Sequence, residues 1–129
     1  MLRCTAALIE KNGKILLALR KPGKHMGRKW EFPGGKIQPG ENPVRALQRE
    51  LEEEFAVRAD IGELLASARY RRAPIDLKVT LYRVVPESDC FVLREHTEIR
   101  WVEPAEVDSY DLVDSDRKLF HNYLSGLTE

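Results

Sequence analysis

WEFPGGKIQPGENPVRALQRELEEEF, residues 30–55, places three glutamates shortly after a glycine-rich turn. Glu50, Glu53 and Glu54 stand at i, i+3 and i+4, so a helix would gather their carboxylates within one turn. Like charges at i and i+4 destabilise a surface helix by roughly a few tenths of a kcal/mol per pair, and by more where they are partly buried. A solvent-exposed helix face is the simplest explanation for such a run. The surrounding residues decide whether these acids have a function.

The same stretch predicts a helix over residues 43–55. Asn42 is a typical N-cap residue, and Pro43 suits the first helical position. At about 100° per residue the apolar side chains share one face, formed by Val44, Leu47, Leu51 and Phe55. The glutamates lie on the arc beside this face and not opposite it. We therefore expect them to line a partly enclosed surface at the edge of the core.

Strands are predicted on both sides of this helix. Asn12-Gly13 is a typical two-residue hairpin turn, residues 21–29 form a basic loop, and Gly34-Gly35 bends the chain. Strands are expected at residues 3–9, 15–19, 30–37, 57–70, 75–85 and 98–102, and a closing helix at residues 115–124. The order β-β-β-α-β-β-β-α predicts an α+β fold, with a mixed sheet between helices as an α/β/α sandwich.

The composition indicates a single domain over residues 1–129. Basic and acidic residues both number 21, so the net charge of zero gives no general attraction to nucleic acid or to a membrane surface. Cys4 and Cys90 lack the spacing of a metal or redox motif, and reduced thiols favour a cytoplasmic protein. The first residues, MLRCTAALIEKNG, are too polar for a signal peptide or a membrane span. We expect no membrane partner and no obligate protein partner.

The residues around the glutamates suggest a chemistry for them. They follow Gly34-Gly35-Lys36, where a glycine backbone can approach a ligand closely and a lysine can meet a phosphate. Clustered carboxylates are the hard oxygen ligands that suit Mg²⁺, which commonly bridges protein acids and substrate phosphates. Together these features predict a site for hydrolysis of a phosphoanhydride bond.

This stretch also resembles a known family motif. The segment Gly35-x5-Glu41-x7-Arg49-Glu50-Leu51-x-Glu53-Glu54-x-Ala56-Val57 is similar to the Nudix box, G-x5-E-x7-R-E-U-x-E-E-x-G-U, over residues 35–57. Every fixed position matches except the last glycine, which is Ala56. The preceding WEFPGGK looks like the version in MutT-type members, and the length and expected element order resemble that group from end to end. The resemblance therefore implies the Nudix fold.

Ala56 stands where the predicted helix should end. A glycine there would adopt the left-handed cap conformation without steric cost. Alanine either pays on the order of 1 kcal/mol for that conformation or forces a different exit from the helix. The departure puts the turn in question but not the acidic cluster, because this position contributes no side-chain chemistry.

The resemblance implies a hydrolase that holds Mg²⁺, with Mn²⁺ as a substitute, and that activates water for attack on a nucleoside diphosphate derivative. The implied metal ligands are Glu50, Glu53, Glu54, the carbonyl of Gly34 and, from outside the box, Glu95. The same four glutamates and Arg49 form the implied catalytic set, in which Arg49 and Glu41 orient the carboxylates. An ordinary exposed loop position would explain Glu95 equally well. Glu50, Glu53 and Glu95 all stay open as the general base.

Phosphate contacts are implied on the basic side chains near the box. The expected residues are Arg20, Lys36 and His25, and each would equally be an ordinary surface or structural residue. Lys36 has the strongest case because it adjoins the Gly-Gly turn.

The base-binding residue is implied near the last helix. Asp116 is expected to bind a guanine-type base, with Asp114 as a competitor. Capping of the helix by Asp114 or Ser115 is the alternative. Phe32 is expected either to form a wall of the base pocket or to belong to the core.

The leading function hypothesis is hydrolysis of a nucleoside triphosphate to monophosphate and pyrophosphate, with 8-oxo-dGTP as a candidate substrate. An alternative is removal of pyrophosphate from RNA 5′ ends, or cleavage of dinucleoside polyphosphates. A basic track for such a polyanion would use Arg69, Arg71, Arg72, Lys21, Lys24, Arg28 and Lys29. A third is a nucleotide-binding module without activity, which the intact glutamates disfavour. The sequence decides neither the base and sugar nor the number of metals, and the oligomeric state also stays open.

Overall fold

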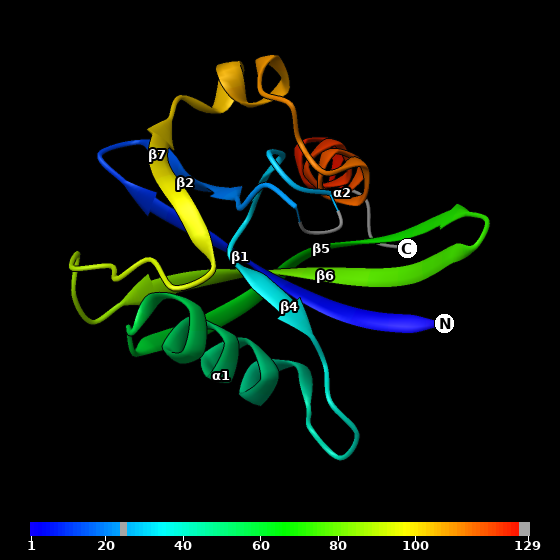
Figure 1. Cartoon of the computed structure of the whole chain (residues 1–129), viewed down its shortest axis with the longest axis horizontal. Helices are drawn as coiled ribbons and strands as arrows, with labels where there is room; N and C mark the ends of the chain where they lie inside the picture. The colour runs from blue at the N-terminus through cyan, green and yellow to red at the C-terminus, as the bar shows by residue number, and fades with distance from the viewer. Residues whose placement is uncertain (24–25, 127–129) are drawn as a thin grey trace.

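In the part of the chain that the computed structural model describes, residues 1–23 and 26–126, a seven-stranded mixed sheet lies between two α-helices (Figure 1). Along the chain the elements are β1 (Leu2–Lys11), β2 (Lys14–Arg20), β3 (Trp30–Glu31), β4 (Gly34–Lys36), α1 (Pro43–Phe55), β5 (Ala59–Arg72), β6 (Ile75–Pro86), β7 (His96–Val102), the 3-10 helix η1 (Pro104–Ser109) and α2 (Asp114–Ser125). The α+β class predicted from the sequence is confirmed. Within the described residues, neither α-helix is long and apolar enough to cross a membrane.

Strand β1 organises the sheet, in which five strands follow the order β3-β2-β1-β6-β5, while β4 pairs with β1 and β7 pairs with β2. It pairs in parallel with β6 from Leu2 to Ile9. At its carboxyl end it turns into β2 through Asn12-Gly13, and both residues have positive φ, as the predicted hairpin turn requires. At its amino end the edge of β1 that faces away from β6 pairs instead with β4. The glycine-rich turn is therefore held beside the central strand of the sheet.

The sheet separates two cores because alternate residues of β1 point to opposite faces. Ala6 and Leu8 belong to the core under α2 and η1, whereas Ala7 and Ile9 belong to the core under α1. Figure 1 shows α1 and α2 on opposite sides of the strands. The acidic helix α1 is thus one outer layer of the molecule.

Helix α1 begins and ends where the sequence predicts, at Pro43 and Phe55. Its apolar face differs from the prediction, because Val44 is 36% exposed and Ala46 is fully buried. At about 100° per residue, Glu50 and Glu54 fall between Ala46 and Leu47 around the helix. Two of the glutamates therefore lie within the buried arc of the helix, not merely beside it.

The prediction of one bent strand over residues 30–37 is wrong. The segment forms two strands with different partners: β3 pairs with β2, and β4 pairs with β1. Pro33 lies between them, and its carbonyl accepts a hydrogen bond from the N–H of Ala7 at 2.8 Å. Proline has no N–H to continue a ladder, so the chain changes partner there. The 3-10 helix η1, which begins with Pro104, was also not predicted.

Ala56 ends α1 in the left-handed conformation, with φ 53° and ψ 38°. Its N–H donates to the carbonyl of Glu52, and the N–H of Val57 donates to the carbonyl of Leu51. This is the hydrogen-bond pattern of a glycine-type helix cap, formed here by alanine. Of the two alternatives for this position, the strained cap is the one that the structure adopts.

We expect Ala56→Gly to raise the free energy of unfolding by about 1 kcal/mol, because glycine adopts positive φ without the steric cost that alanine pays. For a chain of this size the melting temperature should rise by roughly 3–5 °C. Thermal unfolding followed by circular dichroism checks this. Ala46→Gly, inside the same helix, is the matched control and should lose stability. A lower melting temperature for Ala56→Gly would contradict the cap geometry.

Candidate active site

The Gly34-Gly35 turn brings β4 into close contact with both α1 and β1. A Cβ on residue 35 would lie 2.5 Å from Cδ of Glu50, so glycine leaves the space that this carboxylate occupies. Gly34 has φ +153°, and a Cβ there would overlap the carbonyl oxygen of Thr5. Each glycine therefore serves a different contact: Gly35 admits a side chain and Gly34 admits a neighbouring strand.

Four glutamates line a cavity of about 290 Å³, which we call the acidic cavity. Its lining residues are Arg20, Glu50, Glu53, Glu54, Glu95 and His96. Three of the acids come from α1, and Glu95 comes from the loop before β7. The structure thus brings Glu95 to the box glutamates across more than forty positions of sequence. That these four carboxylates bind a metal stays a prediction.

Glu54 is partly buried beside Glu50 in the acidic cavity. Burial, and then its neighbour Glu50, raise the pKa of Glu54 well above the ordinary value. Glu31 and Glu95 add further repulsion of the same sign. Among the described residues, the buried Oε1 atom of Glu54 has no hydrogen-bond partner. A buried carboxylate oxygen without a partner is costly unless something positive meets it.

Arg49 ties the acidic helix to the turn that precedes it. Its Nε and Nη2 donate to the two oxygens of Glu41 at 2.7 and 2.9 Å, and Nη2 also donates to the carbonyl of Lys36. Its Nη1 donates to one oxygen of Glu50 at 2.9 Å and to one of Glu53 at 3.2 Å. The hydrogen bonds from Arg49 lower the pKa of Glu41 to about 2. One guanidinium therefore holds Glu41 and two cavity carboxylates in a fixed arrangement.

The donor set of the acidic cavity fits a divalent cation. Carboxylate oxygens are the ligands that Mg²⁺ prefers, and the unpartnered oxygen of Glu54 is one of them. Among the described residues, no three acidic, histidine or cysteine side chains already converge as a ready metal cage. Glu50 and Glu53 each direct one oxygen to Arg49 instead. Each of these two carboxylates has a second oxygen as a potential ligand.

Glu31 connects the acidic cavity to the rest of the site, a role that is not predicted from the sequence. Both its oxygens accept from Nη1 of Arg20, at 3.1 and 3.2 Å, and Oε2 lies 2.7 Å from Nε2 of His96. The ring of His96 is buried and stacks on Phe55 with 5.0 Å between ring centroids. In the sequence, the position of Glu31 between the apolar Trp30 and Phe32 indicates that this acid is partly buried.

Two further cavities adjoin the acidic cavity and share Arg20 with it. The central cavity, of about 470 Å³, is lined by Gly34, Lys36 and Asp116 among others. The apolar cavity, of about 240 Å³, is bounded by side chains that include Tyr70 and Leu77. The cleft therefore changes from acidic at α1 to apolar at the start of β6.

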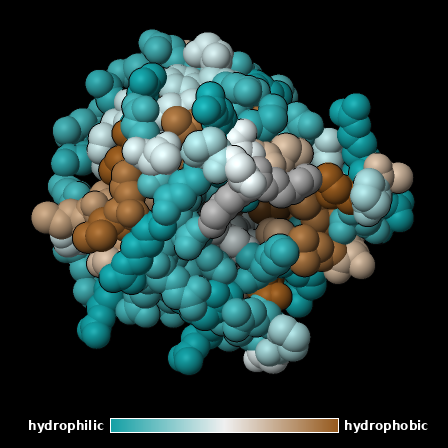
Figure 2. All heavy atoms as spheres, in the orientation of Figure 1, coloured by the Kyte–Doolittle hydropathy of each residue, from teal (hydrophilic) through white to brown (hydrophobic). Residues whose placement is uncertain are grey.

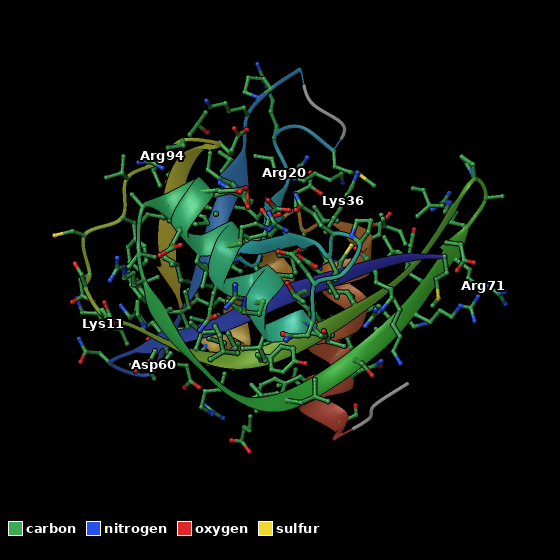
Figure 3. All side chains as sticks on the ribbon, turned by 90° about the horizontal axis from the view of Figure 1, so that it is seen from below. Lys11, Arg20, Lys36, Asp60, Arg71 and Arg94 are labelled. Carbon is green, nitrogen blue, oxygen red and sulfur yellow. The ribbon has the colours of Figure 1, made fainter. Side chains whose placement is uncertain are left out.

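The predicted phosphate-binding residues divide into two groups. Arg20 and Lys36 both line the central cavity, and Figure 3 shows them on the same side of the molecule. Gly34, predicted to offer a carbonyl to the metal, lines the central cavity as well. His25 lies outside the described residues. Arg20 is paired with Glu31, so its guanidinium has a fixed position on the cleft wall.

Asp116 and Phe32 both line the central cavity and contact each other. The Oδ2 atom of Asp116 accepts a hydrogen bond from the N–H of Phe32 at 3.0 Å. Phe32 is 2% exposed and packs on Phe120, so it is a core residue that also lines the cavity. Burial, and then the charge of Glu31, raise the pKa of Asp116 to about 8. The raised pKa favours the protonated form of this carboxyl.

The helix-capping alternative for this region is wrong. The N-cap residue of α2 is Val113, and it makes no side-chain cap. The competitor Asp114 accepts a hydrogen bond from the hydroxyl of Tyr70 at 3.2 Å and is absent from the lining of the central cavity. Asp116 is therefore the acid of α2 that reaches the cleft.

We expect Asp116→Asn to be more stable than the wild type at pH 8 but similar to it at pH 4. In the unfolded chain this carboxyl loses its proton near pH 3.8. In the folded chain the raised pKa keeps the proton on the carboxyl up to about pH 8. Stability from this carboxyl is thus full below pH 4 and declines as the pH rises to about 8. Asparagine cannot ionise, so the variant lacks this decline. Melting temperatures measured from pH 4 to 8 check it, and a constant difference between the two proteins would contradict it.

Lys24 of the predicted basic track lies outside the described residues, and two of the described members are paired. Arg69 and Arg71 both pair with Asp76. Figure 3 shows Arg71 at the end of the β5–β6 hairpin, away from Arg20 and Lys36. The described Arg71 therefore lies apart from the cleft that Arg20 and Lys36 line.

Comparison with known proteins gives matches over nearly the whole chain. The model of the family described as NUDIX domain matches residues 2–123. The CTP pyrophosphohydrolase of Escherichia coli is 34% identical over 97% of this chain and 93% of that protein. An 8-oxo-dGTP diphosphatase of Haemophilus influenzae is 34% identical over 88% of this chain and 83% of that protein.

The fold has counterparts among solved structures. The crystal structure of a MutT protein from Methanosarcina mazei superposes with a TM-score of 0.86 at 23% identity, covering 96% of this chain and 93% of that chain. At this identity the likeness concerns the fold.

Proposed function

This chain belongs to the Nudix family, whose hydrolases act on phosphoanhydride bonds, and from that premise we propose that it converts a nucleoside triphosphate to a monophosphate and pyrophosphate. The acidic cavity is the observation that carries the proposal. Four glutamates with Arg20 on the same wall suit a triphosphate accompanied by divalent cations. The adjoining central and apolar cavities offer a place for the nucleoside.

In this proposal Glu50, Glu53, Glu54 and Glu95 hold Mg²⁺ or Mn²⁺, together with the carbonyl of Gly34. When bound, the cation lowers the pKa of a water molecule and neutralises charge on the leaving pyrophosphate. Hydrolases of this family generally use divalent metal ions. The unpartnered oxygen of Glu54 supports the assignment, because a cation would remove the cost of burying it.

The other charged residues act by holding groups in place. Arg49 keeps Glu50 and Glu53 oriented, and Glu41 keeps Arg49 oriented through two hydrogen bonds. Arg20, held by Glu31, presents a guanidinium to the phosphates from the cleft wall. Lys36 offers a second cation beside the Gly-Gly turn.

Asp116 faces the nucleoside end of the cleft. A protonated carboxyl both donates and accepts hydrogen bonds, so it suits a base edge that carries a donor next to an acceptor. Guanine, oxidised guanine and cytosine all present such an edge. Of the two relatives described above, one is named for CTP and the other for 8-oxo-dGTP, and 8-oxo-dGTP stays our candidate substrate.

A substrate panel tests the proposed function. The rates of hydrolysis with Mg²⁺ should be measured for CTP, dGTP, 8-oxo-dGTP, a dinucleoside polyphosphate and a short 5′-triphosphate RNA. We expect one of the three nucleoside triphosphates to have the highest kcat/KM. A higher value for the RNA or for the dinucleoside polyphosphate would overturn the assignment of substrate class. Nucleotide binding without hydrolysis of any substrate would mean that the chain is a binding module.

A further inference from the structure

The loop between β6 and β7 folds back onto the carboxyl end of α1. The N–H of Val92 donates to the carbonyl of Phe55 at 2.9 Å, and the N–H of Arg94 donates to that of Glu54 at 3.1 Å. The last carbonyls of a helix have no partner within the helix, so an external donor must satisfy them. Here the loop that carries Glu95 supplies those donors.

The side chain of Arg94 continues the same contact. Its Nη1 atom donates to the carbonyls of Glu52 and Glu53 at 3.3 and 3.4 Å. Helix α1 has no basic residue in its own last turn, so Arg94 is the cation at the negative end of the helix dipole. Figure 3 shows Arg94 beside α1. Residue 94 thus meets three successive carbonyls, those of residues 52, 53 and 54.

A third contact fixes the carbonyl side of the same residue. The Nζ atom of Lys21 donates to the carbonyl oxygen of Arg94 at 2.8 Å. Residue 94 is therefore held through its N–H, its side chain and its carbonyl. On the other side of Glu95, the buried ring of His96 stacks on Phe55 of α1. Glu95 lies between two anchors that both attach to the helix carrying the other glutamates.

We propose that Arg94 is a positioning residue, which clamps the loop to the end of α1 and so fixes Glu95 relative to Glu50, Glu53 and Glu54. The inference rests on the proposed function, since it concerns the fourth carboxylate of the same site. The side chain of Arg94 binds the carbonyls of Glu52 and Glu53, in the helical turn that also carries Glu54. Any shift of the clamp therefore changes the spacing of the four carboxylates directly.

Binding of Mn²⁺ alone, measured from the free-ion signal in electron paramagnetic resonance, tests the proposal without relying on turnover. We expect Arg94→Ala to weaken Mn²⁺ binding by about tenfold, which is the smaller of the losses typical for a residue that orients a metal ligand. Glu95→Gln, which changes the carboxylate itself, should weaken binding by a similar factor. The double variant should also lose about tenfold and not a hundredfold, because both changes disable the same carboxylate. Arg94→Lys, which keeps a cation at the helix end, should recover most of the binding.

The control is Arg58→Ala. Arg58 lies just beyond the same helix end, but its side chain is 79% exposed and pairs with the Glu52 side chain at 3.6 Å. This variant should bind Mn²⁺ like the wild type. Additive losses in the double variant, or wild-type binding by Arg94→Ala, would overturn the positioning role while leaving the proposed hydrolysis intact. Failure of the proposed function itself would instead appear as a wild-type protein without hydrolysis.

Discussion

Glu53→Gln is expected to lower kcat by roughly two to three orders of magnitude, comparable with the loss of one preorganised charge-stabilising group in other hydrolases. The fold should be unaffected, because the side chain of Glu53 is 59% exposed and its hydrogen bond to Arg49 is 3.2 Å long. Exposed ion pairs contribute about 0–1 kcal/mol to stability. Activity and stability therefore separate at this residue. Steady-state kinetics with Mg²⁺ and a melting curve measure both.

Glu52→Gln is the matched control for this prediction. Glu52 precedes Glu53 on the same helix, its side chain is similarly exposed, and it lies outside the lining of the acidic cavity. The control should keep wild-type turnover and a nearly unchanged melting temperature. If Glu53→Gln also kept wild-type turnover, Glu53 would have to be removed from the proposed metal site.

Gly35→Ala should lose activity but stay folded, whereas Gly34→Ala should lose stability, although the two glycines are adjacent. At residue 35 the new methyl group meets the Glu50 carboxylate, whose oxygens would lie 2.7 and 2.8 Å away. The carboxylate is the far end of a flexible side chain, so it can move aside without a backbone shift, at the cost of its 2.9 Å hydrogen bond to Arg49. That movement takes Glu50 out of the acidic cavity. We expect activity to fall by about a hundredfold or more in a folded protein.

At residue 34 the new methyl group meets backbone instead. It would overlap the carbonyl of Thr5 in β1, and alanine is strained at φ +153°. The pairing of β4 with the central strand must then break or shift, with a loss of several kcal/mol that endangers folding. Expression and melting curves for both variants check the pair. A well-folded, active Gly34→Ala protein would contradict the packing of β4 against β1.

The parts of the fold that depend on short-range signals could be predicted from the sequence. Asn42 and Pro43 mark the start of α1, and Asn12-Gly13 marks the first hairpin, because capping and turn geometry involve a few neighbouring residues. The crowding of the glutamates could be predicted for the same reason. Helical spacing alone places them within one turn.

The rest depends on partners far away in the chain. The split of residues 30–37 into two strands follows from pairing of β4 with β1, which no local pattern reports. Glu31 meets His96 across 65 positions of sequence, so its role in the site is visible in the folded chain alone. Glu50 and Glu54 lie on the buried side of α1 because they line the acidic cavity there. A prediction that follows the apolar side chains of the helix assigns burial to Val44 instead, which is exposed.

The position of the cleaved bond in the triphosphate decides whether this chain is a pyrophosphohydrolase. Phosphorus NMR of a reaction with CTP or 8-oxo-dGTP and Mg²⁺ distinguishes the possible products in one spectrum. We expect pyrophosphate and a nucleoside monophosphate, with product formation abolished by EDTA and strongly reduced in Glu53→Gln. Orthophosphate with a nucleoside diphosphate, or hydrolysis that continues without divalent cations, would contradict it.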